Sequence, residues 1–283
     1  MASDQAPAPQ TLTYATHDGV ALSGDLYVPA GNGPFPVLVA VHGGGWVQGA
    51  RGSFGHWGRY LAARGIATFT ISYRFASKEK KTFPHAVQDV LAAVQFVRGK
   101  AGALKLDPQR IGLFGNSAGA HLSSLAALGG GGAPFKGGYP QDEFANESAA
   151  VKVLIGVYGV YDVREQWQRF NHGSPTENNV EKHLGCSPMQ DPKTYFEATP
   201  INYATFANNK IAVYLSVGTE DDLVDRRTQT DAFLLALKQA NFYTRTCVVQ
   251  GSGHYWLSDP IDEPHSYPAV LAPKLMRFLA EKL

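Results

Sequence analysis

RIGLFGNSAG, residues 110–119, joins an apolar run of strand length directly to the first turn of a helix. Further out, residues 36–42 and 66–73 are two more runs of strand length, rich in apolar and β-branched side chains. Helix-period segments separate these runs: residues 53–64, closed by Gly65, and a segment that begins near Pro84. Strands buried on both faces and joined by helices indicate a mostly parallel sheet with right-handed crossovers. We therefore predict an α/β fold.

The second half of the chain resumes the alternation. Residues 151–157, 211–217 and 244–249 are strand candidates, Asp225 begins a helix, and residues 269–283 form another. Two irregular stretches interrupt the pattern, and long irregular segments within a compact domain commonly serve as lids or binding loops. We predict a loose tail over residues 1–10 and a single domain over residues 11–283, with lid insertions at 129–148 and 159–205.

Composition narrows the class of protein. The 283 residues carry 25 Lys and Arg against 24 Asp and Glu, with no basic cluster, which argues against a nucleic-acid surface. The 44% of hydrophobic residues is typical of a soluble globule, and no apolar run approaches the ~20 residues of a membrane span. The first residues lack the pattern of a signal peptide. We expect a cytoplasmic location, or an unassigned one if a leader was removed, and the sequence leaves the oligomeric state open.

The most specific chemical signal is GNSAG, residues 115–119, a G-x-S-x-G motif between a predicted strand and a predicted helix. Ser117 occupies a tight turn there, and the small residues on either side let the strand and the helix approach closely. The hydroxyl then projects from the carboxyl end of the sheet, where the helix N-terminus favours negative charge. We predict that Ser117 is a nucleophile.

A second motif, HGGGW at residues 42–46, directly follows the first long apolar strand. Acyl transfer creates a tetrahedral oxyanion, and backbone N–H groups must be preorganised to receive it. Consecutive glycines let the main chain turn its amides into a cavity without obstruction by side chains. The alternative is a flexible turn, which the neighbouring serine motif makes less favourable.

A nucleophilic serine needs a base, and the base needs an orienting carboxylate. His254 lies just beyond the last predicted strand and is the preferred base, with His265 as the alternative. His121, four residues after the serine on the same helix, is predicted to be structural. The acid should follow the strand at 211–217, where Asp221 is preferred and its neighbour Asp222 stays open.

In their order and combination these motifs resemble the esterase/lipase group of α/β-hydrolases, which includes hormone-sensitive-lipase-like and bacterial feruloyl-esterase-like proteins. The resemblance implies an α/β-hydrolase fold and favours Asp221 over its neighbour, since the family's acid lies three residues after a glycine. It also implies oxyanion donors on the backbone of Gly44, Gly45 and Ala118. The matching pieces are residues 42–46, 72–74, 83–84 with Asp89, 115–119, 218–224 and 253–254.

The chain departs from its lipase-like relatives in two places. They carry Asp or Glu before the nucleophile, where this chain has Asn116. They also have a helical N-terminal cap, whereas about 40 residues precede His42 here. Both departures place the chain nearer the feruloyl-esterase-like and kynurenine-formamidase-like branch, with any cap drawn from the two insertions.

We therefore expect a serine carboxylesterase that hydrolyses small to medium esters through an acyl-enzyme, without metal or cofactor. Trp46, Tyr158 and Trp256 are candidates for the substrate pocket, although core packing is the usual fate of aromatic side chains. Two alternatives stay open: an arylformamidase-like amide hydrolase with the same triad, and a catalytically silent hydrolase fold that binds a small ligand. In each case the partner is a small molecule.

Overall fold

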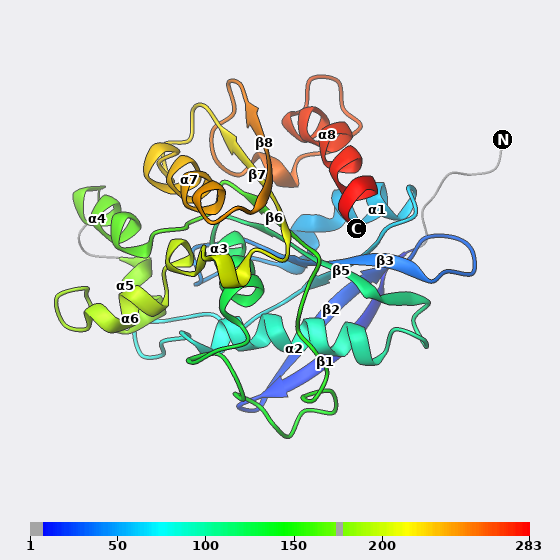
Figure 1. The fold of residues 1–283 in the computed structure, drawn as a ribbon, viewed down its shortest axis with the longest axis horizontal. Helices are drawn as coiled ribbons and strands as arrows, with labels where there is room; N and C mark the ends of the chain where they lie inside the picture. The colour runs from blue at the N-terminus through cyan, green and yellow to red at the C-terminus, as the bar shows by residue number, and fades with distance from the viewer. Residues whose placement is uncertain (1–7, 174–177) are drawn as a thin grey trace.

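The computed structural model describes residues 8–173 and 178–283, which contain one eight-stranded sheet covered by helices on both faces (Figure 1). The strand order is β1-β2-β4-β3-β5-β6-β7-β8. Strand β2 pairs antiparallel with β1 and β4, and the other neighbours pair in parallel, which confirms the predicted α/β class. The strands are β1 (Gln10–His17), β2 (Val20–Tyr27), β3 (Phe35–Val41), β4 (Ala67–Ile71), β5 (Leu106–Asn116), β6 (Val153–Val157), β7 (Ala212–Gly218) and β8 (Tyr243–Val249).

Helices form a layer on each face of the sheet. One face carries α1 (Gly55–Ala62) and α8 (Tyr267–Lys282), and the other carries α2 (His85–Gly99), α3 (Ala118–Gly129) and α7 (Ala232–Gln239). Further helices lie between these elements: η1 (Arg51–Phe54), α4 (Val163–Gly173), α5 (Asn179–Leu184), α6 (Pro192–Glu197), η2 (Pro200–Tyr203), η3 (Phe206–Asn208), η4 (Arg227–Asp231) and η5 (Trp256–Ser258).

Strand β3 shows why the central strands are apolar throughout. Its alternate side chains enter opposite cores: Val37 and Val39 pack with α2 and α3, while Leu38 and Ala40 pack with α1 and α8. A strand that is covered on both faces has no solvent side on which a polar residue would be favoured. The continuous apolar runs that predicted these strands follow from that burial.

The hairpin of β1 and β2 was not predicted. The predicted tail, residues 1–10, also extends too far, because its last residue already belongs to β1. Residues 1–7 of that tail lie outside the described residues, but Gln10 already pairs with Leu26. The turn between the strands is Asp18-Gly19, with φ of 50° and 76°. Asp-Gly between alternating residues is a strong hairpin signal, because both turn positions need positive φ. That signal is present in the sequence, so the hairpin was open to prediction.

The segment at 129–148, predicted as a lid, lies along α2. Phe144 packs beside Gly99 at the end of α2, and Gln95 donates hydrogen bonds to the carbonyls of Ala145 and Glu147. Figure 1 shows this green segment crossing the α2 side of the sheet. None of its residues lines the cavity beside Ser117.

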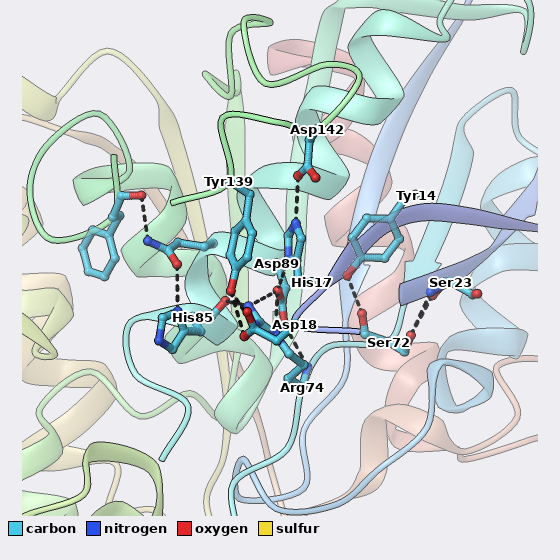
Figure 2. A network of polar contacts seen from close by, with 12 residues as sticks. Tyr14, His17, Asp18, Ser23, Ser72, Arg74, His85, Asp89, Tyr139 and Asp142 are labelled. Carbon is cyan, nitrogen blue, oxygen red and sulfur yellow. Dashed lines mark hydrogen bonds and ion pairs between the residues drawn. The ribbon is translucent and has the colours of Figure 1, made fainter. Parts of the chain in front are cut away.

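A set of polar side chains, most of them buried or partly buried, fastens this segment to the hairpin and to α2. His17 Nδ1 lies 2.6 Å from Asp89 Oδ1, and its Nε2 lies 2.7 Å from Asp142 Oδ2. Arg74 Nε donates to Asp89 Oδ2 at 2.9 Å, and the ring of Tyr139 stacks on His17 at 3.6 Å. Figure 2 shows these side chains converging from four parts of the chain. We call the set the polar network: His17, Asp18, Arg74, Asp89, Tyr139 and Asp142.

The second predicted insertion, residues 159–205, contains α4, α5 and α6. Asp162 begins α4 by accepting hydrogen bonds from the N–H groups of Arg164 and Glu165. The start of α5 lies beside the glycine loop. The side-chain amide of Asn179 occupies the place where a Cβ on Gly45 would point. This segment therefore lies against the site that the motifs predict.

Candidate active site

Ser117 occupies the turn between β5 and α3, with φ of 52° and ψ of −124°. A Cβ on Gly115 would overlap the carbonyl oxygen of Gly119, and a Cβ on Gly119 would overlap that of Val41. Glycine at both positions therefore lets the strand and the helix approach closely enough to form this turn. Backbone strain at a non-glycine residue persists where the surrounding structure enforces it, and such residues concentrate at functional sites.

The structure brings Ser117, His254 and Asp221 into one row of hydrogen bonds. His254 Nε2 lies 3.0 Å from Ser117 Oγ, and its Nδ1 lies 2.7 Å from Asp221 Oδ2. Asp221 follows β7 and His254 follows β8, so two adjacent parallel strands deliver them to the same edge of the sheet. Because Nδ1 faces a carboxylate it carries the ring proton, and Nε2 can accept the proton of the serine hydroxyl.

The loop that carries Asp221 fixes its carboxylate from two sides. Asp221 Oδ1 accepts hydrogen bonds from the N–H groups of Leu223 at 3.0 Å and Val224 at 2.9 Å. The carbonyl of Leu223 in turn accepts from Gln166 Nε2 and Arg169 Nε of α4, both at 3.1 Å. This brace from α4 had no local signal in the sequence, because it joins residues more than 50 positions apart.

The two alternative candidates lie apart from this row. Asp222 is exposed. It contacts α4 through its backbone carbonyl, which accepts a hydrogen bond from Arg169. His265 is exposed in the turn that precedes α8. The geometry therefore brings together the two residues that the sequence analysis preferred as acid and base.

The glycine loop after β3 lies against the nucleophile turn. Gly44 and Gly45 have φ of 119° and 60°, a conformation that favours glycine, and the carbonyl of Gly44 accepts from the N–H groups of Val47 and Gln48 at 3.2 Å. Ala118 is the first residue of α3, so its N–H has no partner within the helix. These three amides are the predicted oxyanion donors.

Asn116, the residue in which the chain departs from lipase-like relatives, links this loop to His254 through Tyr158. Its Oδ1 accepts from the N–H of Gly43 at 2.9 Å, and its Nδ2 donates to the hydroxyl of Tyr158 at 3.1 Å. The ring of Tyr158 packs against His254 with centroids 4.4 Å apart. An amide side chain suits this place because it accepts on one side and donates on the other.

The three aromatic candidates for the substrate pocket are all buried. Trp46 donates from Nε1 to His121 Nδ1, Tyr158 lies behind His254, and Trp256 packs edge-on against Tyr158. None of the three lines the cavity beside Ser117. Burial raises the pKa of the Tyr158 hydroxyl, which is therefore neutral in the working range.

A cavity of about 170 Å³ opens beside Ser117 on the side of the glycine loop. At about 30 Å³ for each water of liquid volume, this is room for a group of roughly six non-hydrogen atoms. Tyr255, with φ of 70° and 65% of its surface exposed, stands at its edge. The lining residues are Gly43, Gly44, Gly49, Ala50, Ser53, Phe54, Asn116, Ser117, Tyr255, Leu257 and Ser258.

Within residues 8–173 and 178–283, no group of three or more His, Cys, Asp and Glu side chains is arranged to hold a metal ion. Over the same ranges, the helices all fall short of the length and apolar character that crossing a membrane demands.

The sheet order, the serine elbow and the flanking helices define the chain as an α/β-hydrolase. The solved structure of the esterase Est2 from Thermogutta terrifontis aligns with it at a TM-score of 0.79 and 23% identity, over 98% of this chain and 93% of that one. The same esterase has also been solved with propionate bound. At this identity the likeness shows the fold.

Sequence comparisons narrow the class. The probable isoprenylcysteine alpha-carbonyl methylesterase ICME of Oryza sativa subsp. japonica is 28% identical over 245 residues, 84% of this chain and 56% of that protein. The Arabidopsis thaliana protein ICMEL2, another probable methylesterase of this kind, is 30% identical over 261 residues, 89% of this chain and 58% of that protein. The chain thus spans about half the length of the curated relatives it matches.

The BD-FAE family model matches residues 24–237, and the chain belongs to the BD-FAE family. This match confirms the resemblance to the esterase/lipase group of α/β-hydrolases and agrees with its feruloyl-esterase-like branch.

Proposed function

We propose that the protein is a serine carboxylesterase that cleaves esters through a Ser117–His254–Asp221 triad. The observation that carries the proposal is the unbroken row of hydrogen bonds from Asp221 through His254 to Ser117 Oγ at the carboxyl edge of the sheet. Its relatives support the reaction class, since the matched plant proteins are named methylesterases and the Thermogutta protein an esterase.

In the acylation step, Ser117 Oγ attacks the ester carbonyl carbon while His254 Nε2 takes the hydroxyl proton. The tetrahedral intermediate carries its negative charge on the former carbonyl oxygen. When the intermediate collapses, the bond to the alcohol oxygen breaks and His254 returns its proton to the leaving alcohol. Asp221 stabilises the imidazolium and keeps the ring in the required orientation throughout.

In the deacylation step, water takes the place of the serine. His254 accepts a proton from the water as the water oxygen attacks the acyl carbon, and then protonates Ser117 Oγ as the acid leaves. The amides of Gly44, Gly45 and Ala118 receive the oxyanion in both steps. Removing one such donor typically costs about 100- to 1,000-fold in kcat.

The cavity beside Ser117 supports a short group on one side of the scissile bond. Its volume of about 170 Å³ suits an acyl group of a few carbons, and its wall is mainly glycine backbone and small or apolar side chains. The structures of Est2 with propionate and with butyrate bound, at 23% and 24% identity, support the same size class by analogy. We therefore expect acetyl to butyryl esters to be better substrates than long-chain esters.

The test is hydrolysis of p-nitrophenyl acetate by matched variants. Ser117→Ala should lose covalent turnover, and Asp221→Asn should lower kcat by about 10⁴-fold because the imidazole tautomer is no longer held. Asp222→Asn is the matched control and should keep the wild-type rate. Wild-type turnover by the Ser117→Ala variant would overturn the proposal.

A panel of substrates separates the alternatives. Phenyl acetate, a feruloyl ester and N-formylkynurenine should be assayed side by side, with preference for the formamide favouring the amide hydrolase. A fluorophosphonate probe that fails to label Ser117 in the wild-type protein would instead favour a ligand-binding protein without catalysis.

A further inference from the structure

Trp46, directly after the glycine loop, holds a backbone conformation that its side chain does not favour. Its φ is 63°, in the left-handed region, and the residue is 1% exposed. For a bulky residue this conformation is an outlier that costs on the order of 1–2 kcal/mol, and it persists only where the surroundings enforce it. Because Gly44 and Gly45 immediately precede it, whatever holds Trp46 also fixes the direction of their N–H groups.

Three contacts hold Trp46 in place. Its indole Nε1 donates to His121 Nδ1 at 3.1 Å, and the indole plane stacks on His183 with centroids 5.1 Å apart and an interplanar angle of 8°. Its carbonyl accepts from the N–H of Ala76 at 2.9 Å. We call Trp46, His121 and His183 the indole cluster.

His121 is the member of the indole cluster that joins the glycine loop to the nucleophile. It lies on α3 one turn after Ser117, whose carbonyl accepts from the His121 N–H at 3.2 Å. Because Nδ1 accepts the indole hydrogen bond, the ring proton is on Nε2, which donates to the carbonyl of Ala198 at 2.8 Å. Complete burial lowers the pKa of His121 to about 4, so the ring stays neutral and Nδ1 stays an acceptor near pH 7.

We propose that His121 is a positioning residue for catalysis: by holding the indole of Trp46, it sets the Gly44 and Gly45 amides at the place where the oxyanion forms. The proposal rests on the proposed function, since it assigns His121 a part in the same oxyanion site. The sequence analysis predicted a structural role for His121, and the proposal specifies what that structure serves.

Two variants of His121 test this role. His121→Leu keeps a similar bulk and removes both ring nitrogens, whereas His121→Asn keeps an acceptor near the position of Nδ1. For p-nitrophenyl acetate we expect His121→Leu to lower kcat about 10- to 100-fold, part of the effect of losing an oxyanion donor, with KM within about threefold of the wild type. His121→Asn should recover most of the lost kcat.

A transition-state analogue gives a readout that a packing defect would not move. A short trifluoromethyl ketone adds Ser117 Oγ to its carbonyl and forms an oxyanion, whereas the matching methyl ketone reports ground-state binding. Across the variants, the inhibition constant of the trifluoromethyl ketone should rise by the same factor by which kcat falls. The inhibition constant of the methyl ketone should stay constant.

Trp46→Phe removes the same hydrogen bond from the other side and guards against poor folding of the His121 variants. We expect the same fall in kcat. Trp167→Phe is the matched control, because Trp167 on α4 loses an indole hydrogen bond to Glu181 of α5 and the variant should keep the wild-type kcat.

The outcomes separate the two proposals. Should His121→Leu and Trp46→Phe both keep kcat within threefold while their melting temperatures fall, the indole cluster is packing alone and the inference is overturned. Ester hydrolysis that survives Ser117→Ala would overturn the proposed function instead.

Discussion

The polar network and the indole cluster both bury histidines, and the two sites treat the proton in opposite ways. In the polar network both ring nitrogens of His17 face carboxylates, Asp89 and Asp142. In the indole cluster His121 accepts an indole N–H and donates to a carbonyl. Both side chains are fully buried. Because both side chains are buried, the neighbouring acceptors and donors make the difference between the two imidazoles.

The pKa values follow these surroundings. Burial by itself lowers the pKa of His17, but the hydrogen bonds to Asp89 and Asp142 outweigh it and raise the pKa above the ordinary 6.5. Burial lowers the pKa of His121 to about 4, and it lowers the pKa of His183 well below 6.5. Folding thus favours proton uptake at one site and opposes it at the other.

The largest effect should come from removing the carboxylate at the centre of the polar network. Asp89→Asn removes the buried carboxylate that pairs with both Arg74 and His17, and leaves them only the exposed Asp18 and the partly buried Asp142, so we expect the free energy of unfolding to fall by about 3–5 kcal/mol. Urea unfolding at pH 7 measures it. Lys100→Ala, which breaks the exposed pair with Glu143, is the control and should cost about 1 kcal/mol or less. A loss below 1 kcal/mol in Asp89→Asn would mean that the network carries no buried charge.

The next effect is a loss of stability in acid that originates in the indole cluster. Because the folded pKa of His121 is about 4 against 6.5 in the unfolded chain, the unfolded state alone binds this proton between those values. Stability from His121 is complete above about pH 6.5 and falls by about 3 kcal/mol as the pH drops to about 4. Urea unfolding of the wild type and of His121→Asn from pH 8 to pH 4 measures this loss. The difference between their free energies of unfolding should become smaller as the pH falls. A constant gap would contradict the neutral assignment.

His17 should show the opposite dependence on pH. A raised folded pKa contributes stability that is complete below about pH 6.5 and is lost as the pH rises through the folded pKa. His17→Gln should therefore lower the free energy of unfolding by about 2 kcal/mol at pH 6 and by less at pH 9. The measurement is the urea midpoint of both proteins at the two pH values. A larger loss at pH 9 would show that His17 is neutral.

The smallest effect belongs to the exposed edge of the polar network. The Tyr139 hydroxyl accepts from Arg74 at 2.6 Å and donates to Asp18 at 3.1 Å, while its ring stacks on His17. Tyr139→Phe keeps the stacked ring and removes both hydrogen bonds, so we expect a loss of about 1 kcal/mol. Thermal unfolding compared with Tyr139→Leu separates the hydroxyl from the ring. If both variants lose equally, the ring contributes nothing.

Local signals account for the parts of the molecule that the sequence predicted well. The strand before Ser117, the glycines at 115 and 119 and the start of α3 follow from short-range turn and helix chemistry, and the structure has them as expected. The preference for Asp221 over Asp222 was strengthened by the family pattern, because neighbouring carboxylates differ in where they point and not in composition. The Asp18-Gly19 turn carried a local signal that was overlooked.

Long-range contacts account for most of what the sequence left undetermined. The segment at 129–148 is held to the hairpin where Asp142 meets His17, 125 residues away in the chain. Trp46 is buried against His121 and His183 instead of facing the cavity, a fate set by residues 75 and more positions distant. Residue type gives no sign of either partnership, so spacing and periodicity had no means of finding them.

The braces from residues 159–205 bear on how the substrate range of such a protein can change. Gln166 and Arg169 hold the carbonyl beside the acid, and Ala198 accepts the hydrogen bond from His121. A chimera that exchanged this whole segment for that of a relative would gain new surroundings for the substrate and lose both supports at once. New specificities should therefore arise more readily from single substitutions along the cavity wall, at Ala50, Ser53 or Leu257, than from recombination of the entire segment.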